Sequence, residues 1–179
     1  MCALGAKDKQ VRPVMVAITV LNSIFINFAV KYLYMEDLYI GIYDFASPEY
    51  DEAVSLRYEV LRKPLGLEFS AEQLAEEYKD VHIGAWTAGG MVGTLTMTKL
   101  DQNVVKMRQV AVSEVVQSKG VGSALVHFSE HWALSNGFTK LVLHARDTAV
   151  PFYKKLGYDS IGDAFVEVGI AHQKMGKEL

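Results

Sequence analysis

Residues 117–123 carry the clearest chemical signature of the chain. They lie between an alternating apolar run, 104–112, and a run with helical spacing, 121–136. The first N–H groups of a helix have no partner inside the helix, and the helix dipole attracts negative charge to them. Two glycines let a phosphate approach the backbone, because glycine has no Cβ. We therefore predict an anion site at a helix N-terminus, formed by Gln117, Ser118, Lys119, Gly120, Val121, Gly122 and Ser123.

Three glycine-rich patterns compete for this loop. A Walker A loop places a lysine directly after its last glycine, and no lysine follows Gly122. A Rossmann fingerprint has a third glycine where this chain has Leu125. The pattern Gln/Arg-x-x-Gly-x-Gly/Ala after a strand fits from Gln117 to Gly122. Taken alone, it is equally compatible with an ordinary turn that needs glycine for its backbone angles.

The third pattern resembles the coenzyme A pyrophosphate loop of the GNAT superfamily of N-acetyltransferases. Two more segments share the resemblance, in the same order and spacing. The run 148–158, Thr-Ala-Val-Pro-Phe-Tyr-Lys-Lys-Leu-Gly-Tyr, resembles the helix that follows the fifth strand of these enzymes. The run 104–112 resembles their fourth strand, which splays from the fifth. Residues 165–175 resemble a bacterial branch whose last strand reads Glu-x-Gly-Ile-x-His-x-x-Met.

The resemblance covers nearly all of residues 37–179 and implies one α/β (α+β) domain. We expect a mixed, mainly antiparallel sheet of about six to seven strands flanked by about four helices. The sequence predicts helices at 48–61, from Ser70 onward, at 121–136 and around Tyr153. It predicts strands at 38–45, 82–87, 91–100, 104–112, 141–144, 158–161 and 165–174.

The resemblance also implies acetyl-CoA as cofactor. The backbone of Val110, Ala111 and Val112 would line the pantetheine arm, and the N–H groups of 117–123 would hold the pyrophosphate. Tyr153 matches the tyrosine that protonates the leaving thiolate, because a phenol with a pKa near ~10 stays protonated at neutral pH. The alternative for Tyr153 is an aromatic residue that packs its helix on the sheet.

The sequence departs from the family pattern at the position where many members carry the general base. Many members carry a glutamate on the fourth strand, and this chain has none between Lys106 and Gln109. The candidates are His144, at the end of the fifth strand, and Glu167 with His172 near the C-terminus. On one strand Glu167 and His172 would face opposite sides unless a bulge at Gly169 resets the register. A structural, hydrogen-bonded histidine is the alternative for each of the two.

The first helix is implied to form one wall of the acceptor site. Its end carries Arg57, Glu59, Arg62 and Lys63, which favours an acceptor with polar or ionic groups; a solvated helix face is the alternative. The acceptor is a primary amine of a small molecule, a peptide N-terminus or a lysine. The implied function is direct acetyl transfer to this amine. Alternatives are a non-catalytic acyl-CoA-binding sensor and an ATP-binding protein.

Length, charge and cysteine content exclude several classes of protein and of binding site. The 179 residues suit one domain. A net charge of −3 argues against nucleic acid as a partner. The single cysteine, Cys2, excludes a disulfide framework and a cysteine-rich zinc site, and we expect no metal. A homodimer is possible through an exposed final strand.

Residues 1–36 differ from the rest of the chain. The stretch 14–30 is strongly apolar, but Asn22, Ser23 and Asn27 interrupt it. A membrane-spanning helix needs roughly 20 apolar residues. We expect first an appended segment without catalytic role, second a membrane anchor, and third a signal peptide. The expected location is the cytoplasm, with membrane anchoring through residues 14–30 as the alternative.

Overall fold

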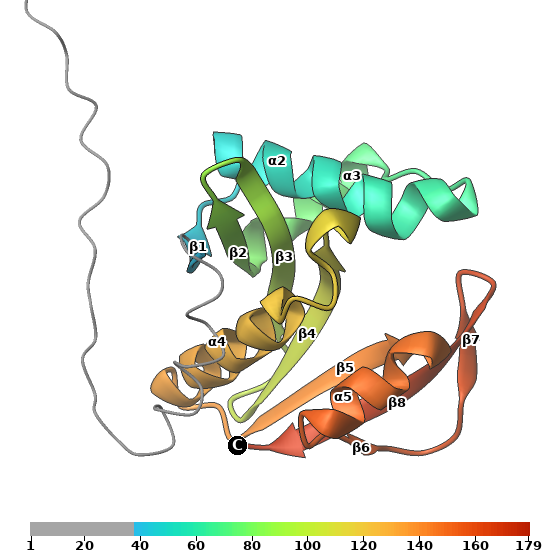
Figure 1. The fold of residues 1–179 in the computed structure, drawn as a ribbon. Coiled ribbons are helices and arrows are strands. Elements are labelled where there is room, and N and C mark those ends of the chain that lie inside the picture. The colour runs from blue at the N-terminus through green and yellow to red at the C-terminus, as the bar shows by residue number, and fades with distance from the viewer. Residues whose placement is uncertain (1–37) are drawn as a thin grey trace, which may run out of the picture. The chain divides into compact units, whose positions relative to one another are not determined.

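Eight strands form one mixed sheet in residues 38–179, the part of the chain that the computed structural model describes (Figure 1). The strand order is β1-β2-β3-β4-β5-β8-β6, and β7 also pairs with β8. Only β4 and β5 run parallel. The strands are β1 Tyr39–Tyr43, β2 Val81–Thr87, β3 Gly90–Lys99, β4 Val104–Val112, β5 Lys140–Arg146, β6 Asp159–Ser160, β7 Phe165–Glu167 and β8 Ile170–Glu178.

Four α-helices accompany the sheet within residues 38–179: α2 Pro48–Arg57, α3 Ala71–Ala75, α4 Val121–Ser135 and α5 Val150–Lys155. Local sequence explains where they begin. The Ser47 hydroxyl accepts the Tyr50 N–H at the start of α2. Ser70 and Gln73 form a capping box at the start of α3, where the sequence predicted a helix. The first helix continues beyond α2 as a π-helical turn, Tyr58–Arg62, so the predicted end near residue 61 is confirmed.

The C-terminal segment differs from the prediction. Residues 165–174 were expected to form one strand, and they form a hairpin of β7 and β8 instead. Val168 and Gly169 both have positive φ, at 47° and 76°, as the tightest hairpin turns require. The expectation that the final strand is an exposed edge is also wrong, because β8 pairs with β5 on one side and with β6 and β7 on the other.

Strands β4 and β5 separate halfway along their length, as the sequence predicted. They pair in parallel from Val104 opposite Lys140 to Met107 opposite Leu143, and no further. Beyond this point β4 keeps its pairing with β3, but its edge toward β5 is open. Figure 1 shows the two strands diverging from a common end. The opening begins next to Gln109, a residue with a φ of 52° at an irregularity in β4.

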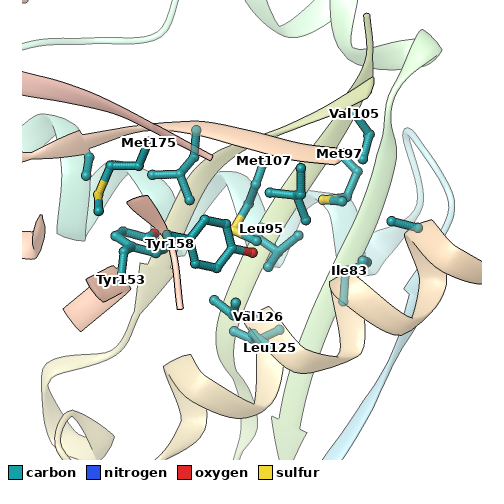
Figure 2. Packing of buried hydrophobic residues seen from close by; sticks show 14 of the residues in the cluster. Ile83, Leu95, Met97, Val105, Met107, Leu125, Val126, Tyr153, Tyr158 and Met175 are labelled. Atoms are coloured by element: carbon teal, nitrogen blue, oxygen red, sulfur yellow. The ribbon is translucent and has the colours of Figure 1, made fainter. Parts of the chain in front are cut away.

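Helix α4 packs against the face of the sheet opposite to the face that α2 covers. Its Leu125 and Val126 are fully buried, and Figure 2 shows them beside Leu95 and Met107 of the sheet. Gly93 on β3 permits this packing, because a Cβ there would come within 2.8 Å of the Leu125 side chain. The start of α4 is therefore fixed against the sheet, next to the end of β4.

No helix within residues 38–179 is long and apolar enough to cross a membrane. The predictions for residues 1–36, including a membrane anchor at 14–30, concern residues outside the described part of the chain.

Candidate active site

A cavity of about 230 Å³ opens where β4 and β5 separate. All four predicted catalytic side chains line it: Tyr153, His144, Glu167 and His172. Val110, from the predicted pantetheine strand, lines it as well. Residues that are far apart in the sequence thus share one space. The remaining lining residues are Leu61, Arg62, Phe69, Lys106, Met107, Arg108, Gln109, Leu143, Ala145, Arg146, Ala149 and Val168.

His144 and Glu167 form a hydrogen-bonded pair in this cavity. His144 Nδ1 lies 2.9 Å from Glu167 Oε2. A carboxylate only accepts, so the Nδ1 proton points at Glu167 and Nε2 is left to take a proton. Burial works against ionisation of Glu167, but the hydrogen bond from His144 and the nearby His144, His172 and Lys106 outweigh it and lower its pKa. The pair has the arrangement of a base and the carboxylate that orients it.

Two neighbours fix the position of the His144 ring. The edge of the His144 ring contacts Phe165, with 4.8 Å between the ring centroids. Lys106 Nζ lies 3.4 Å from both ring nitrogens of His144, so the ammonium group lies against the ring. The orientation of the imidazole is therefore set before any substrate binds.

His172 has a more structural setting than His144. It is buried, stacks on Phe165, and its Nδ1 lies 2.9 Å from the carbonyl oxygen of Ile170. The hairpin puts it on a different strand from Glu167, so no bulge is needed to bring both to one cavity. His172 supports the wall of the cavity, and its catalytic role stays a prediction.

Tyr153 reaches the cavity from the first turns of α5. The side chain is 6% exposed and packs edge-on against Phe152 and Tyr158. Its hydroxyl has no hydrogen-bond partner among residues 38–179. Burial raises the pKa of the phenol well above its ordinary value of 10, so the group stays protonated in the physiological range. Tyr153 packs in the core and also lines the cavity, and its role as a proton donor stays a prediction.

The predicted phosphate loop joins the end of β4 to the start of α4. Gly120 is the residue before the helix and has a φ of 94°. The Gln117 side chain donates to the Val112 carbonyl oxygen at 3.1 Å and ties the loop to β4. A Cβ on Gly122 would lie 3.4 Å from the Phe152 ring, so a larger residue there would press on α5.

The loop offers a set of free backbone donors. The N–H groups of Gln117 and Lys119 already bond to the carbonyl oxygens of Glu114 and Val116, at 3.3 Å each. Within the described residues, the donors that remain without an acceptor belong to Ser118, Gly120, Val121, Gly122 and Ser123. This is the arrangement that binds phosphate at a helix N-terminus.

The end of the first helix only partly matches the prediction. Arg57, expected in the acceptor wall, is fully buried and forms a two-pronged ion pair with Glu77, at 2.8 and 2.9 Å. Arg57 also donates to the side chain of Gln109 at 2.6 Å. Glu59 and Lys63 form an exposed pair away from the cavity lining. Only Arg62 of the predicted set faces the cavity.

Sequence reasoning missed three cations of the cavity: Lys106, Arg108 and Arg146. The missed signal is their spacing, because residues two apart on a strand share a face. Lys106 lies two residues before Arg108, and His144 two before Arg146. A second hollow of about 700 Å³ adjoins the first and shares Arg62, Phe69, Arg108 and Gln109 with it.

Comparison with known proteins agrees with this site. The sequence model of the acetyltransferase (GNAT) domain matches residues 49–179. This chain belongs to the GNAT acetyltransferase family. An uncharacterised N-acetyltransferase of Bacillus subtilis is 29% identical over 128 residues, which is 71% of this chain and 91% of the relative. Family membership makes the protein an acyltransferase, as the sequence predicted.

Solved structures share the GNAT fold of this chain. An aminoglycoside 6′-N-acetyltransferase in complex with coenzyme A has a TM-score of 0.65 at 18% identity, and covers 78% of this chain and 96% of its own. A GNAT acetyltransferase of Elizabethkingia anophelis with acetyl-CoA bound has a TM-score of 0.62 at 17% identity, with coverage of 80% and 99%. The predicted fold class is confirmed, with eight strands where six to seven were expected.

Proposed function

We propose that this GNAT protein moves an acetyl group from acetyl-CoA directly to a primary amine. The observation that carries the proposal is the single cavity lined by the His144–Glu167 pair and by Tyr153, beside the open edge of β4. An acyl transfer to an amine needs a group that takes a proton and a group that gives one. Both kinds of group face the same space here.

Acetyl-CoA fits the two open backbone features that flank the cavity. The unpaired edge of β4, at Val110, Ala111 and Val112, suits the amide groups of the pantetheine arm. The free N–H groups at the start of α4 suit the pyrophosphate. The two solved relatives that carry coenzyme A or acetyl-CoA support the same cofactor. Lys119 is an exposed cation of the loop and adds to its attraction for phosphate.

The proposed reaction uses the groups of the cavity in a defined order. The Nε2 atom of His144 takes a proton from the acceptor ammonium or amine. The amine nitrogen then forms a bond to the thioester carbon, and the C–S bond breaks. The leaving thiolate receives the proton of the Tyr153 hydroxyl, and the proton that the nitrogen loses as the amide forms returns to the phenolate and restores the phenol. Glu167 keeps the imidazole in the tautomer that accepts at Nε2.

Direct transfer is favoured over a covalent acetyl-enzyme. The only cysteine of the chain is Cys2, which is not part of the domain that contains the cavity. Within that domain a thiol nucleophile is therefore absent from the sequence. Amine and acetyl-CoA would bind together, with the amine entering from the side of Arg62 and the thioester from the side of Val110.

Steady-state kinetics tests the proposal. Free thiol is measured while acetyl-CoA and an amine are both varied, with a panel of small amines and short peptides as acceptors. We expect amine-dependent thiol release and intersecting double-reciprocal lines, which a ternary complex produces. Parallel lines would indicate an acetyl-enzyme and contradict direct transfer. Binding of acetyl-CoA without any amine-dependent release would favour a sensor role on the same fold.

A further inference from the structure

The cavity holds many more cations than acids. Four of its lining side chains are cationic and one is a carboxylate, Glu167. That carboxylate already accepts the His144 hydrogen bond. Two of the cations come from β4, one from β5 and one from the π-helical turn: Lys106, Arg108, Arg146 and Arg62.

Most of these cations have no acidic partner in the described part of the chain. Arg62, Lys106 and Arg146 make no ion pair there. Arg108 has only a contact of 3.9 Å with Asp80, near the limit for an ion pair. Lysines elsewhere in the domain are either paired, such as Lys63 with Glu59 at 2.7 Å, or exposed to solvent, such as Lys119 and Lys154. The three unpaired cations of the cavity are instead half-buried.

Two guanidinium groups are held in place at the cavity. Arg62 lies over the Phe69 ring, with its carbon 4.6 Å from the ring centre. The Nη2 atom of Arg146 donates to the Leu61 carbonyl oxygen at 2.9 Å. This bond spans from the end of β5 to the π-helical turn that carries Arg62. Packing and hydrogen bonds thus keep both arginines beside the cavity, although neither has a counter-ion.

The charges of the cavity repel one another. Burial and the charge of Arg62 both lower the pKa of Arg146. Burial, Arg108 and Lys174 lower the pKa of Lys106, and Glu167 opposes them only in part. An anion between these groups would relieve the repulsion. A guanidinium group matches a carboxylate or a phosphate with two parallel hydrogen bonds.

We propose that the acceptor is a primary amine that also carries an anionic group, a carboxylate or a phosphate, which binds between Arg62 and Arg146 while the amine reaches His144. The inference rests on the proposed acetyl transfer and names its class of acceptor. His144 and Arg146 share a face of β5, about 7 Å apart along the strand. The amine and the anionic group are therefore separated by a short chain of a few bonds.

Coenzyme A itself does not account for these cations. Its phosphates fit the loop 117–123, and no residue of that loop lines this cavity. The cations instead surround His144, where the amine must be placed for deprotonation. They are thus located to recognise the acceptor.

Product binding tests the inference without relying on turnover. Calorimetry measures the affinity of the full-length protein, saturated with coenzyme A, for N-acetyl-4-aminobutanoate and for its uncharged amide. N-acetyl-2-aminoethyl phosphate serves as the phosphate ligand. We expect one of the two anions to bind at least about tenfold more tightly than the amide, as charged hydrogen bonds imply. Whichever anion binds more tightly identifies the acidic group.

Matched variants locate the effect in the cavity. Arg62→Gln and Arg146→Gln should each reduce the preference for the anion by about tenfold and leave amide binding unchanged. Lys63→Gln removes an adjacent, exposed charge outside the lining and should keep the preference. Equal affinity for acid and amide in the wild type, or an equal loss of both in the variants, would overturn the inference.

Measurements of turnover distinguish a failure of this inference from a failure of the proposed function. Free 4-aminobutanoate and 4-aminobutanamide are compared as acceptors in the thiol-release assay. Equal kcat/KM values would retain acetyl transfer and overturn the anionic acceptor. No release with any amine, together with selective binding of the acid, would support the anion site and overturn the transfer itself.

Discussion

Glu167 on β7 accepts a hydrogen bond from His144 on β5, although β8 lies between these two strands in the sheet. The contact exists because the β7–β8 hairpin turns at Val168 and Gly169 and brings β7 back toward the cavity. The hairpin thus supplies a carboxylate to a histidine 23 residues away. A base and its orienting group come from two separate parts of the sheet.

Glu167→Gln should lower kcat and leave the affinity for acetyl-CoA unchanged. A glutamine can either accept from Nδ1 of His144 with its oxygen or donate to it with its NH2 group. The proton is then no longer fixed on Nδ1, so Nε2 loses part of its capacity to accept. We expect a fall of about tenfold, at the low end for acid–base catalysis, because Glu167 is half-exposed. Glu178→Gln is the matched control, since it breaks an exposed ion pair with Lys140 on the same sheet. A kcat equal in both variants would exclude the role of Glu167.

Tyr153→Phe should reduce kcat by about 100-fold, the range expected for loss of a positioned proton donor. Burial raises the pKa of this phenol, so its ionisation should not limit kcat at any pH up to about 10. Tyr158→Phe is the control, because this ring packs against Tyr153 but does not line the cavity. An alkaline loss of kcat below pH 10 that disappears in Tyr153→Phe would contradict the protonated state proposed here.

Gly120→Ala should weaken acetyl-CoA binding by at least about tenfold, because charged hydrogen bonds from the loop would be lost. An alanine at a φ of 94° is strained by about 1–2 kcal/mol and would move the free N–H groups. Gly137→Ala introduces similar strain at a φ of 83°, just beyond the opposite end of α4 from the loop. Calorimetry should show unchanged acetyl-CoA affinity for Gly137→Ala; an equal loss in both variants would mean a general folding effect.

Glu77→Gln should destabilise the domain by about 3–5 kcal/mol at pH 7, because it leaves the buried Arg57 charge without its partner. Glu76→Gln, next to it, removes an exposed pair with Lys79 and should cost less than about 1 kcal/mol. Denaturant unfolding measures both. Similar losses of unfolding free energy in the two variants would show that the buried ion pair stabilises the domain no more than the exposed one.

The same pair predicts a dependence on pH. Burial raises the pKa of Glu77, but the hydrogen bond and charge of Arg57, with bonds from Tyr50 and Gln109, outweigh it and leave the pKa below 4.5. A lowered pKa in the folded state gives stability that is complete above 4.5 and is lost as the pH falls further. The difference in unfolding free energy between wild type and Glu77→Gln should therefore narrow below pH 4.5. A constant difference from pH 7 to pH 3 would contradict this origin.

Local patterns in the sequence explain how much of the fold was predictable. The alternation of apolar residues in 104–112 predicted β4 with its correct bounds, and Ser70 predicted the start of α3, where it forms a capping box with Gln73. The glycines of 120–122 indicated the turn into α4. Each of these signals depends on neighbouring residues alone. The hairpin at Val168 escaped prediction because a β-branched residue rarely adopts a positive φ.

The features of the site that were not predicted depend on contacts between segments that are far apart in the sequence. Arg57 was expected in the wall of the acceptor site, with a solvated helix face as the alternative, but it is buried because its partner Glu77 lies on another segment. The cationic cavity forms because Arg62 and Arg146 meet across the opening between β4 and β5. Neither contact has a signature within a short stretch of sequence. The loop and Tyr153 could be identified because each belongs to a local pattern of the family.

The most direct test of the account is a mass balance of the reaction. The full-length protein is incubated with acetyl-CoA and a panel of acidic and neutral primary amines, and free coenzyme A and acetylated amine are both quantified by mass spectrometry. We predict equal molar amounts of the two products, formed only when amine is present and strongly reduced in Tyr153→Phe. Release of coenzyme A without acetylated amine, or no release from a protein that binds acetyl-CoA, would contradict the proposed transfer.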